Sequence, residues 1–375
     1  AAITTSNTKV AGDYYFKDIL KGAAAFNINL RRHDITTSYY DLRRVLPNIL
    51  GKVLPQQLSR LGVFDYNGTS QINSNTFTTQ ANFLSDIGVA KASVSIDNYR
   101  DVALASYKGN ITLSSFDMGT LTKETSLGEV SANLRIDGRG FTQKTVDTGL
   151  SGLISSFSFQ GYDYKNITLQ GALKDPVFNG DLSIDDPNLQ LDFKGLVDVS
   201  ESFNQYDFQA DVRFAELNQL QLVARDSISV FAGKVVVDMD GTTIDDIVGS
   251  FSFQQTFYQN QDDDFYFDDF KIASSFEDQK RIIDINSPDI CNGTISGNFL
   301  IKDISNLFKN GLGSMYANYI PREVTTNQYI DYDLSVYSKI VEVFVPQIQV
   351  GENSRLRGSV SSDESKFQLD FNSPE

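Results

Sequence analysis

The densest group of side chains that could do chemistry is an acidic cluster. Asp262, Asp263 and Asp264 stand together, and Asp268 and Asp269 follow after three aromatic residues. Several carboxylate oxygens are the ligands that Ca²⁺ prefers. The EF-hand pattern, with a glycine at its sixth loop position and a closing glutamate, is absent, and so are the nonapeptide repeats of calcium-binding β-helices. We therefore expect a solvated hairpin tip rather than a metal site.

The sequence contains few residues that could act as a catalytic nucleophile with its base or bind zinc. The chain contains one histidine, His33, and one cysteine, Cys291. These leave no pair for an intramolecular disulfide and too few ligands for most zinc sites. No G-x-S-x-G element and no glycine-rich phosphate loop occurs. We expect His33 on the surface beside a turn and Cys291 as a small packed side chain.

The charge and composition of the chain argue against several further classes of function. Lys and Arg number 32 against 48 Asp and Glu, so the net charge is −16 at pH 7. This balance argues against nucleic acid and against an anionic membrane surface, because basic side chains bind both. Carboxylate pairs could hydrolyse glycosides, but the acidic residues fall in turns or at alternating positions, and no tryptophan is present to stack on a sugar. We expect no enzyme, cofactor or metal.

The sequence carries no recognisable targeting or spanning segment. Its first residues, AAITTSNTKV, lack the basic and apolar regions of a signal peptide. No run approaches the ~18 apolar residues of a membrane-spanning helix. We expect a soluble chain or an excised segment of a longer one.

Apolar and polar residues alternate over most of the chain. Leu189, Leu191 and Phe193 alternate with Gln190 and Asp192, and similar runs recur to the end of the sequence. A period of two indicates strands with one apolar and one wet face. Since no long helix separates most of these runs, folds built from βαβ units are excluded.

Glycines and turn dipeptides suggest how the strands connect. Between Gly109 and Gly180 glycines recur at intervals of 9 to 12 residues, a spacing typical of one strand plus one turn. The dipeptides Asn179-Gly180 and Asp240-Gly241 favour tight hairpins, so neighbouring strands should pair antiparallel. Asp185 to Asn188 contains Pro187 and should form another turn.

One segment has helical periodicity instead. From Ser38 to Leu61 the apolar residues keep a spacing of three to four. Ser38 is a start signal and Gly62 a stop signal. Pro47 and Pro55 should break the segment into short helices.

A second helical run extends from Ile304 to about Tyr316, and both runs are expected to cap an end or edge of the sheet. Helices are otherwise too few to cover a one-sided sheet, whose apolar face must be buried on something. A sandwich, a closed barrel, a solenoid or a curled sheet that lines a groove remains possible. We divide the chain into residues 1–66, with N-terminal strands and the first helical segment, and residues 67–375, a β-groove with a helical insertion near 304–316.

Several stretches resemble the TamB family, the inner-membrane component of the translocation and assembly module, and most closely its branch in Bacteroidetes-type bacteria. The resemblance covers essentially the whole chain. The stretches that carry it are GYDYKNITLQGALKDPVFNGDLSIDDPNLQLDFKGLVDVS (161–200), TTSYYDLRRVLPNILGKVLP (36–55), DDFKIASSFEDQKRIIDINSPDI (268–290) and QYIDYDLSVYSKIVEVFVPQI (328–348).

The resemblance implies an all-β protein with minor α content: an elongated, curled antiparallel sheet, or β-taco, with an apolar interior and short capping helices. It implies an internal portion of a longer protein in the bacterial periplasm. A missing N-terminal helix would anchor that protein in the inner membrane, and a missing C-terminal segment would meet TamA, an outer-membrane barrel. The implied function is outer-membrane biogenesis, with phospholipid moving between the two membranes.

Alternation and resemblance together predict an apolar stripe that shields phospholipid acyl chains, since each buried CH₂ contributes ~0.8 kcal/mol. The same side chains could instead pack across a dry core. The expected lining residues are Ile167, Leu169, Leu182, Ile184, Leu189, Leu191, Phe193, Val197, Val199, Phe208, Val212, Phe214, Val235, Val237, Ile295, Phe299, Ile301, Leu334, Val336, Phe367, Leu369 and Phe371.

Three other functions fit the alternation. A scaffold for outer-membrane protein assembly could accept client β-strands at its sheet edges. An outer-membrane β-barrel also alternates at about ten residues per strand, although the helical segments and the lack of tryptophan argue against it. A closed β-sandwich adhesin would have a dry, fully packed interior.

Overall fold

Alternating side chains place most of the chain in antiparallel strands, as their period of two predicts. The computed structural model describes residues 2–4, 8–18, 25–45, 56–101, 103–142, 144–174, 177–198, 204–314, 316, 318–338, 341, 350–363 and 367–374. Strands account for 65% of the chain and helices for 10%. The predicted all-β class, a curled antiparallel sheet with few short helices, is therefore confirmed.

The chain divides into two units within a single strand, β12 (Leu189–Asp198). Unit 1 comprises Ala1–Asp192 with Gln219–Leu222, and unit 2 comprises Phe193–Asn218 with Val223–Glu375. The boundary that we drew between residues 66 and 67 lies inside a strand, β4 (Val63–Asn73).

Among its described residues, unit 1 contains eleven further strands and three short helices. They are β1 (Ala2–Thr4), β2 (Lys9–Lys17), β3 (Asn27–Ser38), α1 (Tyr39–Val45), η2 (Gln56–Leu61), β4, β5 (Thr76–Ser85), β6 (Gly88–Asp97), β7 (Ser106–Asp117), α2 (Met118–Thr122), β8 (Leu127–Arg139), β9 (Asp147–Phe159), β10 (Tyr162–Lys174) and β11 (Val177–Asp186).

Unit 2 continues from the second half of β12. It contains β13 (Asn204–Glu216), β14 (Ser229–Gly241), β15 (Val248–Asn260), β16 (Asp264–Glu277), β17 (Lys280–Asn286), β18 (Cys291–Asn298), η3 (Ile301–Asp303), α3 (Ile304–Gly313), β19 (Tyr329–Val336), β20 (Ser354–Ser361) and β21 (Phe367–Asn372).

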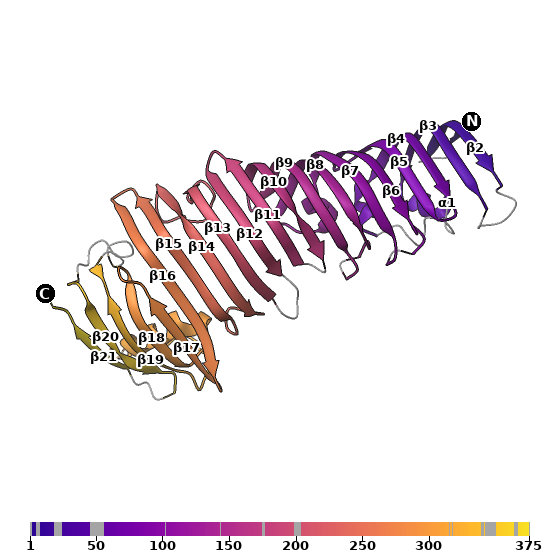
Figure 1. Ribbon diagram of the computed structural model, residues 1–375. Coiled ribbons are helices and arrows are strands. Elements are labelled where there is room, and N and C mark those ends of the chain that lie inside the picture. Colours follow the sequence, from indigo (N-terminus) through magenta and orange to yellow (C-terminus); the bar gives the residue numbers. More distant parts are fainter. Residues whose placement is uncertain are drawn as a thin grey trace. The chain divides into compact units, whose positions relative to one another are not determined.

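Within each unit, strands pair with their neighbours in sequence, as Figure 1 shows. In unit 1 each strand from β1 to β11 pairs antiparallel with the next one in sequence. In unit 2 the same holds from β13 to β21. Among the described strands, the first and last of each run have no pairing with each other, so neither sheet closes on itself. Each unit is thus an open sheet built from successive hairpins.

The glycines lie mostly inside strands, which corrects their assignment to turns. Asn179 and Gly180 fall within β11, where Gly180 pairs with Gly171 of β10. A Cβ on Gly180 would lie 2.5 Å from the Gly171 Cα, so the two backbones approach too closely for side chains. Asp240 and Gly241 end β14 and lead into a longer loop, not a two-residue turn. Close approach of strands, rather than chain reversal, explains these glycines.

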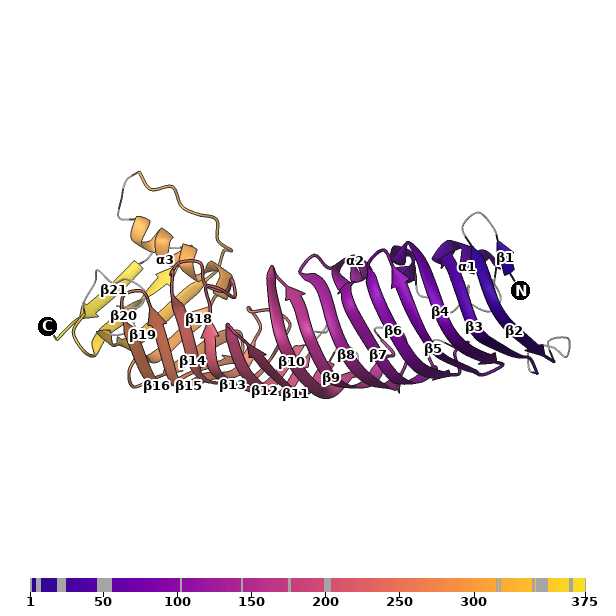
Figure 2. The ribbon, with the colours of Figure 1, turned by 90° about the horizontal axis from the view of Figure 1, so that it is seen from above.

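Bulges bend the strands at further positions. Arg32, Ser115, Asn166 and Gln255 adopt positive φ angles of 41–53° inside β3, β7, β10 and β15. The β3–β4, β7–β8 and β14–β15 registers shift beside Arg32, Ser115 and Gln255. A bulge inserts an unpaired residue and increases local twist and bending. The strands of unit 1 curve along their length in Figure 2, and these devices account for the curl.

The first helical segment begins and ends where its signals predict. The Ser38 hydroxyl accepts a hydrogen bond from the Asp41 N–H at 3.2 Å at the start of α1. Gly62, with φ +69°, follows η2. Pro47 and Pro55 lie outside the described residues.

Two other helices differ from expectation. The second predicted helix, α3, ends at Gly313 instead of Tyr316. Helix α2 was not predicted, because it is only one turn long. Asp117 caps it by accepting a hydrogen bond from the Thr120 N–H at 2.8 Å.

Two glycines of β9 test the role of close strand approach. Gly152 has φ +146°, and a Cβ there would overlap the Asn133 carbonyl of β8 and lie 3.1 Å from the Leu134 Cα. Gly149 has only an ordinary 3.5 Å contact with the Asp137 carbonyl. We expect Gly152→Ala to lower the free energy of unfolding by roughly 1–3 kcal/mol in urea titrations, and Gly149→Ala to change it by less than about 0.5 kcal/mol. Equal effects would contradict this account of the glycines.

Candidate functional site

Strand register in unit 1 brings predicted lining residues onto one face of the sheet. Ile167 of β10 lies opposite Ile184 of β11, and Leu169 lies opposite Leu182. The isoleucines are 5% and 7% exposed, and the leucines are half-buried. We call the face that carries such side chains the apolar face of each unit, and the opposite one the polar face.

In unit 2 the apolar face continues the pattern with larger side chains. The Phe193 ring on β12 lies 5.1 Å from the Phe208 ring on β13, centroid to centroid. Phe208 is opposite Val237 of β14, and Val235 is opposite Ala210. Phe193, Phe208 and Val235 are half-buried. The alternation therefore predicted correctly which side chains share this face.

The remaining predicted lining residues of β12 and β13 differ in their strand partners and in whether the structure describes them. Leu189, Leu191 and Val197 are half-buried on β12, and Val199 lies outside the described residues. On β13, Val212 is opposite Gly233.

A bulge after Val212 shifts the register of β13, so that Ala215, not Phe214, pairs with Phe231. Phe214 is half-buried at this bulge. Strict alternation cannot locate such an insertion.

Several aromatic residues of this face were missed by the sequence interpretation. Phe251 and Phe253 of β15 have ring centroids 4.7 Å apart, and Phe253 lies 5.5 Å from Phe231 and 6.3 Å from Phe270. All four rings are half-buried. The alternation of Phe251 and Phe253 with serine and glutamine was a visible signal for two of them.

Helix α3 covers another part of the predicted stripe. Leu307 of α3 is 1% exposed and packs in a cluster with Ile330, Tyr332 and Val360, which are 0%, 6% and 1% exposed. This cluster also takes in five predicted lining residues, Ile295, Phe299, Ile301, Leu334 and Phe367. Those five side chains therefore lie in a packed core under α3.

Two expectations at the end of β18 were wrong in detail. The strand ends at Asn298, so Phe299 lies beyond it and Ile301 begins η3. Past the α3 cluster, Leu369 and Phe371 of β21 are 46% and 49% exposed, and Val336 is half-buried at the end of β19.

Helical turns cover the apolar face of unit 1 over β4 to β7. Leu61 of η2 is 4% exposed and packs with Phe64, Ile87 and Phe116, together with Leu42 of α1 and the α2 side chains Met118 and Leu121. Figure 2 shows α1 and α2 beside these strands and α3 over the last strands of unit 2. The described helices make their main contacts with β3, β8, β20 and β21 and with one another.

The apolar face thus has an uncovered stretch in each unit. In unit 1 it spans β9 to β11, and in unit 2 it spans β12 to β16. No described helix packs on either stretch, although Ile167, Ile184 and Val237 are buried among their neighbours. We call these stretches the open apolar faces. They are the candidate functional site, because an apolar surface without a second layer is suited to an apolar ligand.

Polar groups near the strand ends are mutually satisfied. Asp186, 2% exposed, accepts hydrogen bonds from the Tyr162 hydroxyl at 2.5 Å and the Lys165 N–H at 2.8 Å. Burial and this carboxylate raise the pKa of Tyr162 to about 12. The Arg225 guanidinium and the Tyr258 hydroxyl hold the pKa of the buried Asp226 at about 2. These groups are therefore paired with one another, and they stabilise the ends of the strands and the loop after β13.

Arg281 interrupts the apolar face on β17. Its side chain is 1% exposed, and its guanidinium lies 4.6 Å from the Phe276 ring centroid. It donates hydrogen bonds to the Ser274 hydroxyl and to the Asp245 carbonyl, and burial lowers its pKa. Arg281 therefore ties the loop after β14 to β17.

His33 is buried, which corrects its expected position at the surface. It lies in β3 with 2% exposure, stacks on Tyr66 at a centroid distance of 4.4 Å and bonds the Ser70 hydroxyl at 2.9 Å. Ser70 donates in turn to Thr79 at 3.0 Å. The bulge at Arg32 turns His33 to the apolar face, a change that sequence spacing does not reveal.

The other chemical candidates have simple structural roles. Asp262 and Asp263 form the exposed tip between β15 and β16, as predicted, and Asp268 and Asp269 are exposed along β16. Cys291 is half-buried, and burial raises its thiol pKa to about 11. In the described ranges, no three His, Cys, Asp or Glu side chains are placed to share a metal ion.

Comparisons with known proteins identify no relative from which a function for the open apolar faces could be inferred. The chain matches no protein-family model, and no curated protein or solved structure matches it. Among the described helices, none has the length and apolar character needed to cross a membrane.

The difference between open and covered parts of the apolar face can be measured by making the same Val→Phe substitution at one position in each part. Val235 is half-buried on the open face of unit 2, whereas Val360 is 1% exposed beneath α3. We expect Val360→Phe to lower the free energy of unfolding by roughly 1–3 kcal/mol, because a packed core does not accept extra volume. Val235→Phe should cost less than about 0.5 kcal/mol, because no described helix packs over Val235 and the added ring can extend away from the sheet. A similar loss for both variants would show that β14 is covered.

The buried histidine predicts a specific pH dependence. Burial lowers the pKa of His33 below the ordinary value of 6.5, so below pH 6.5 the unfolded chain binds a proton that the folded chain does not. Stability should therefore fall as the pH drops through 6.5 and level off below the folded pKa, by ~1.4 kcal/mol for each unit of difference.

Because His33 is the only histidine, urea titrations between pH 7.5 and 5.5 isolate its effect from that of the carboxyl groups. The His33→Gln variant should have nearly constant stability over this range. An unchanged slope in this variant would assign the effect to other groups.

Proposed function

We propose that the open apolar faces hold the acyl chains of phospholipids and that the protein is a non-enzymatic lipid carrier in bacterial outer-membrane biogenesis. The observation that carries this proposal is the row of half-buried aromatic and aliphatic side chains on β12 to β16. Phe193, Phe208 and Phe253 belong to it, and no described helix packs on them.

Their partial exposure favours a flexible apolar ligand over a dry core. In a dry core these rings would be as buried as Ile330 and Val360 of the α3 cluster, at 0% and 1% exposure. An acyl chain laid along the face would cover them, and each buried CH₂ would contribute ~0.8 kcal/mol. About ten methylenes would then contribute roughly 8 kcal/mol before the cost of ordering the chain.

The polar face supports a carrier that works in water. In unit 2 its strands present carboxylates at alternating positions, among them the exposed Asp207 and Asp211 of β13 and Asp238 of β14. Their repulsion disfavours stacking of two such sheets through their polar faces. A lipid headgroup could remain in water at the rim while its chains contact the apolar face.

The resemblance to TamB proteins adds the cellular setting to this proposal. The chain would be an internal part of a longer periplasmic protein with an inner-membrane anchor and a TamA-like barrel partner, both contacted through other parts of that protein. The curled sheet and its apolar face are consistent with that family.

A second candidate is a scaffold that accepts client β-strands, and β21 favours it. This strand pairs with β20, and no other described strand pairs with its second edge. Its side chains Leu369 and Phe371 are 46% and 49% exposed. Strand addition at such an edge would satisfy its backbone groups.

Photocrosslinking in cells distinguishes the two candidates. A photoreactive phenylalanine analogue is placed at Phe193 or Phe208 on the apolar face, and at the exposed Gln209 as the matched control on the polar face of the same strand. The proposal predicts phospholipid adducts at the two phenylalanine positions and none at Gln209. Protein adducts at a further probe on Leu369 of β21, without lipid adducts at Phe193 and Phe208, would favour the scaffold. No adducts at Phe193 and Phe208 would contradict the lipid function.

A further inference from the structure

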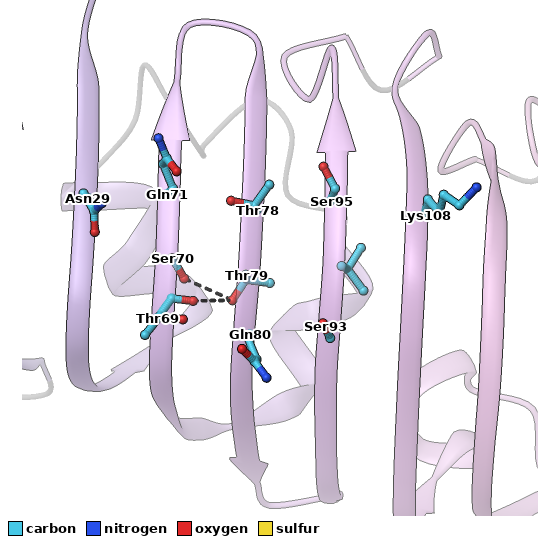
Figure 3. Close-up of a pocket in the computed structure, with 11 residues that line it drawn as sticks. Asn29, Thr69, Ser70, Gln71, Thr78, Thr79, Gln80, Ser93, Ser95 and Lys108 are labelled. Atoms are coloured by element: carbon cyan, nitrogen blue, oxygen red, sulfur yellow. Dashed lines mark hydrogen bonds between the residues drawn. The ribbon is translucent and has the colours of Figure 1, made fainter.

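On the polar face of unit 1 over β3 to β7, uncharged polar side chains lie in register on successive strands. They form rows across neighbouring strands, set by the pairing register. The first row joins Asn29, Gln71, Thr78, Ser95 and Lys108, and Figure 3 shows these side chains at one level on successive strands. Amides and hydroxyls dominate it, whereas the next strand, β8, presents Arg135, Asp137 and Arg139.

Two further rows run parallel to the first. Thr69, Gln80, Ser93 and Asn110 form the second row. Asn67, Asn82, Lys91 and Thr112 form the third. Neighbouring strands are ~4.8 Å apart, so each row offers one polar side chain about every 4.8 Å.

Shallow troughs lie between these rows. One, of about 500 Å³, has the first and second rows as its walls and Ser70, Thr79 and Val94 beneath it. The other, of about 340 Å³, has the second and third rows as its walls and Gly68, Ala81 and Ala92 as its floor. Both cross the strands, and Gln80 and Ser93 line both.

The walls have unused hydrogen-bonding capacity. Within the described part of the chain, the side chains of Gln71, Gln80, Ser93 and Asn110 make no hydrogen bond to protein. Other polar-face side chains are paired, such as Ser183 with Asp192 of β12 at 2.6 Å. Each free amide can donate and accept at once, which suits a ligand that carries hydroxyl groups along its length.

From this arrangement we infer a binding site for a linear, uncharged glycan on the polar face of unit 1. On β4 to β7 only Lys91 and Lys108 carry charge in the three rows, and Lys108 is paired with Asp137 at 2.8 Å, whereas Asp34 of β3 lies opposite Asn67 at the end of the third row. The rows therefore lack the cations that a nucleic acid strand requires, the carboxylates that a metal requires and the apolar surface that a lipid requires. A polymer of sugar rings presents hydroxyls at a repeat close to the strand spacing.

The expected affinity follows from the number of contacts. One neutral hydrogen bond changes an equilibrium by about tenfold or less, and no aromatic ring lines the troughs for stacking. Measurable binding thus needs several strands to contact several rings at once. A hexasaccharide should bind with a millimolar to high-micromolar dissociation constant, and a monosaccharide should not bind measurably.

Isothermal titration calorimetry of the whole chain with cellohexaose, chitohexaose or maltohexaose tests the site. We expect at least one hexasaccharide to bind. The double variant Gln80→Ala/Ser93→Ala, which removes a facing pair common to both troughs, should weaken that binding by about tenfold or more.

The matched control is Gln170→Ala/Ser151→Ala, because this pair also faces across two strands, β9 and β10, on the polar face of unit 1. It should leave the affinity unchanged. No binding by any of the three hexasaccharides, equal losses in both double variants, or equal binding of glucose would each overturn the site. The lipid proposal concerns the opposite face and is not affected by these outcomes.

Discussion

Each unit is a single layer of sheet, and one of its two faces is apolar and has to be shielded from water. The other features of the structure follow from this constraint. A one-sided sheet normally packs on a second sheet or a layer of helices. The described helices do so only locally, over β4 to β7 in unit 1 and through α3 in unit 2. Where they pack, side chains such as Leu307 and Ile330 are fully buried, and elsewhere Phe208 and Phe253 keep part of their surface exposed. The contrast locates the candidate site.

The glycines and bulges of the backbone, and the side chains of the polar faces, suit a sheet of a single layer. Glycines such as Gly152 and Gly180 permit close strand approach, and bulges at Arg32 and Gln255 add bends, so the sheet curls instead of lying flat. The two polar faces differ: that of unit 2 carries carboxylates, whereas β3 to β7 of unit 1 carry free amides and hydroxyls in register. The two faces of unit 1 can therefore bind different classes of ligand.

The sequence was sufficient to predict the fold class and most of the apolar face, because alternation directly reports which side chains share a face. It failed where the period breaks. The bulge beside Phe214 and the one that buries His33 depend on an inserted residue, which alternation cannot place. Gly180 was assigned to a turn because its dipeptide favours one, yet strand contact decides its position. The helical run of α3 was expected to cap the sheet, but the lining residues that it buries could not be predicted, because they depend on tertiary packing.

Native mass spectrometry of the chain, produced in the bacterial periplasm and purified without detergent, tests the central claim most directly. The account predicts that the intact chain carries one or more phospholipid masses and that lipid extraction returns it to its bare mass of 41.7 kDa. A chain that is found only at its bare mass, although its apolar face is open by the Val235 measurement, would contradict the lipid-carrying function.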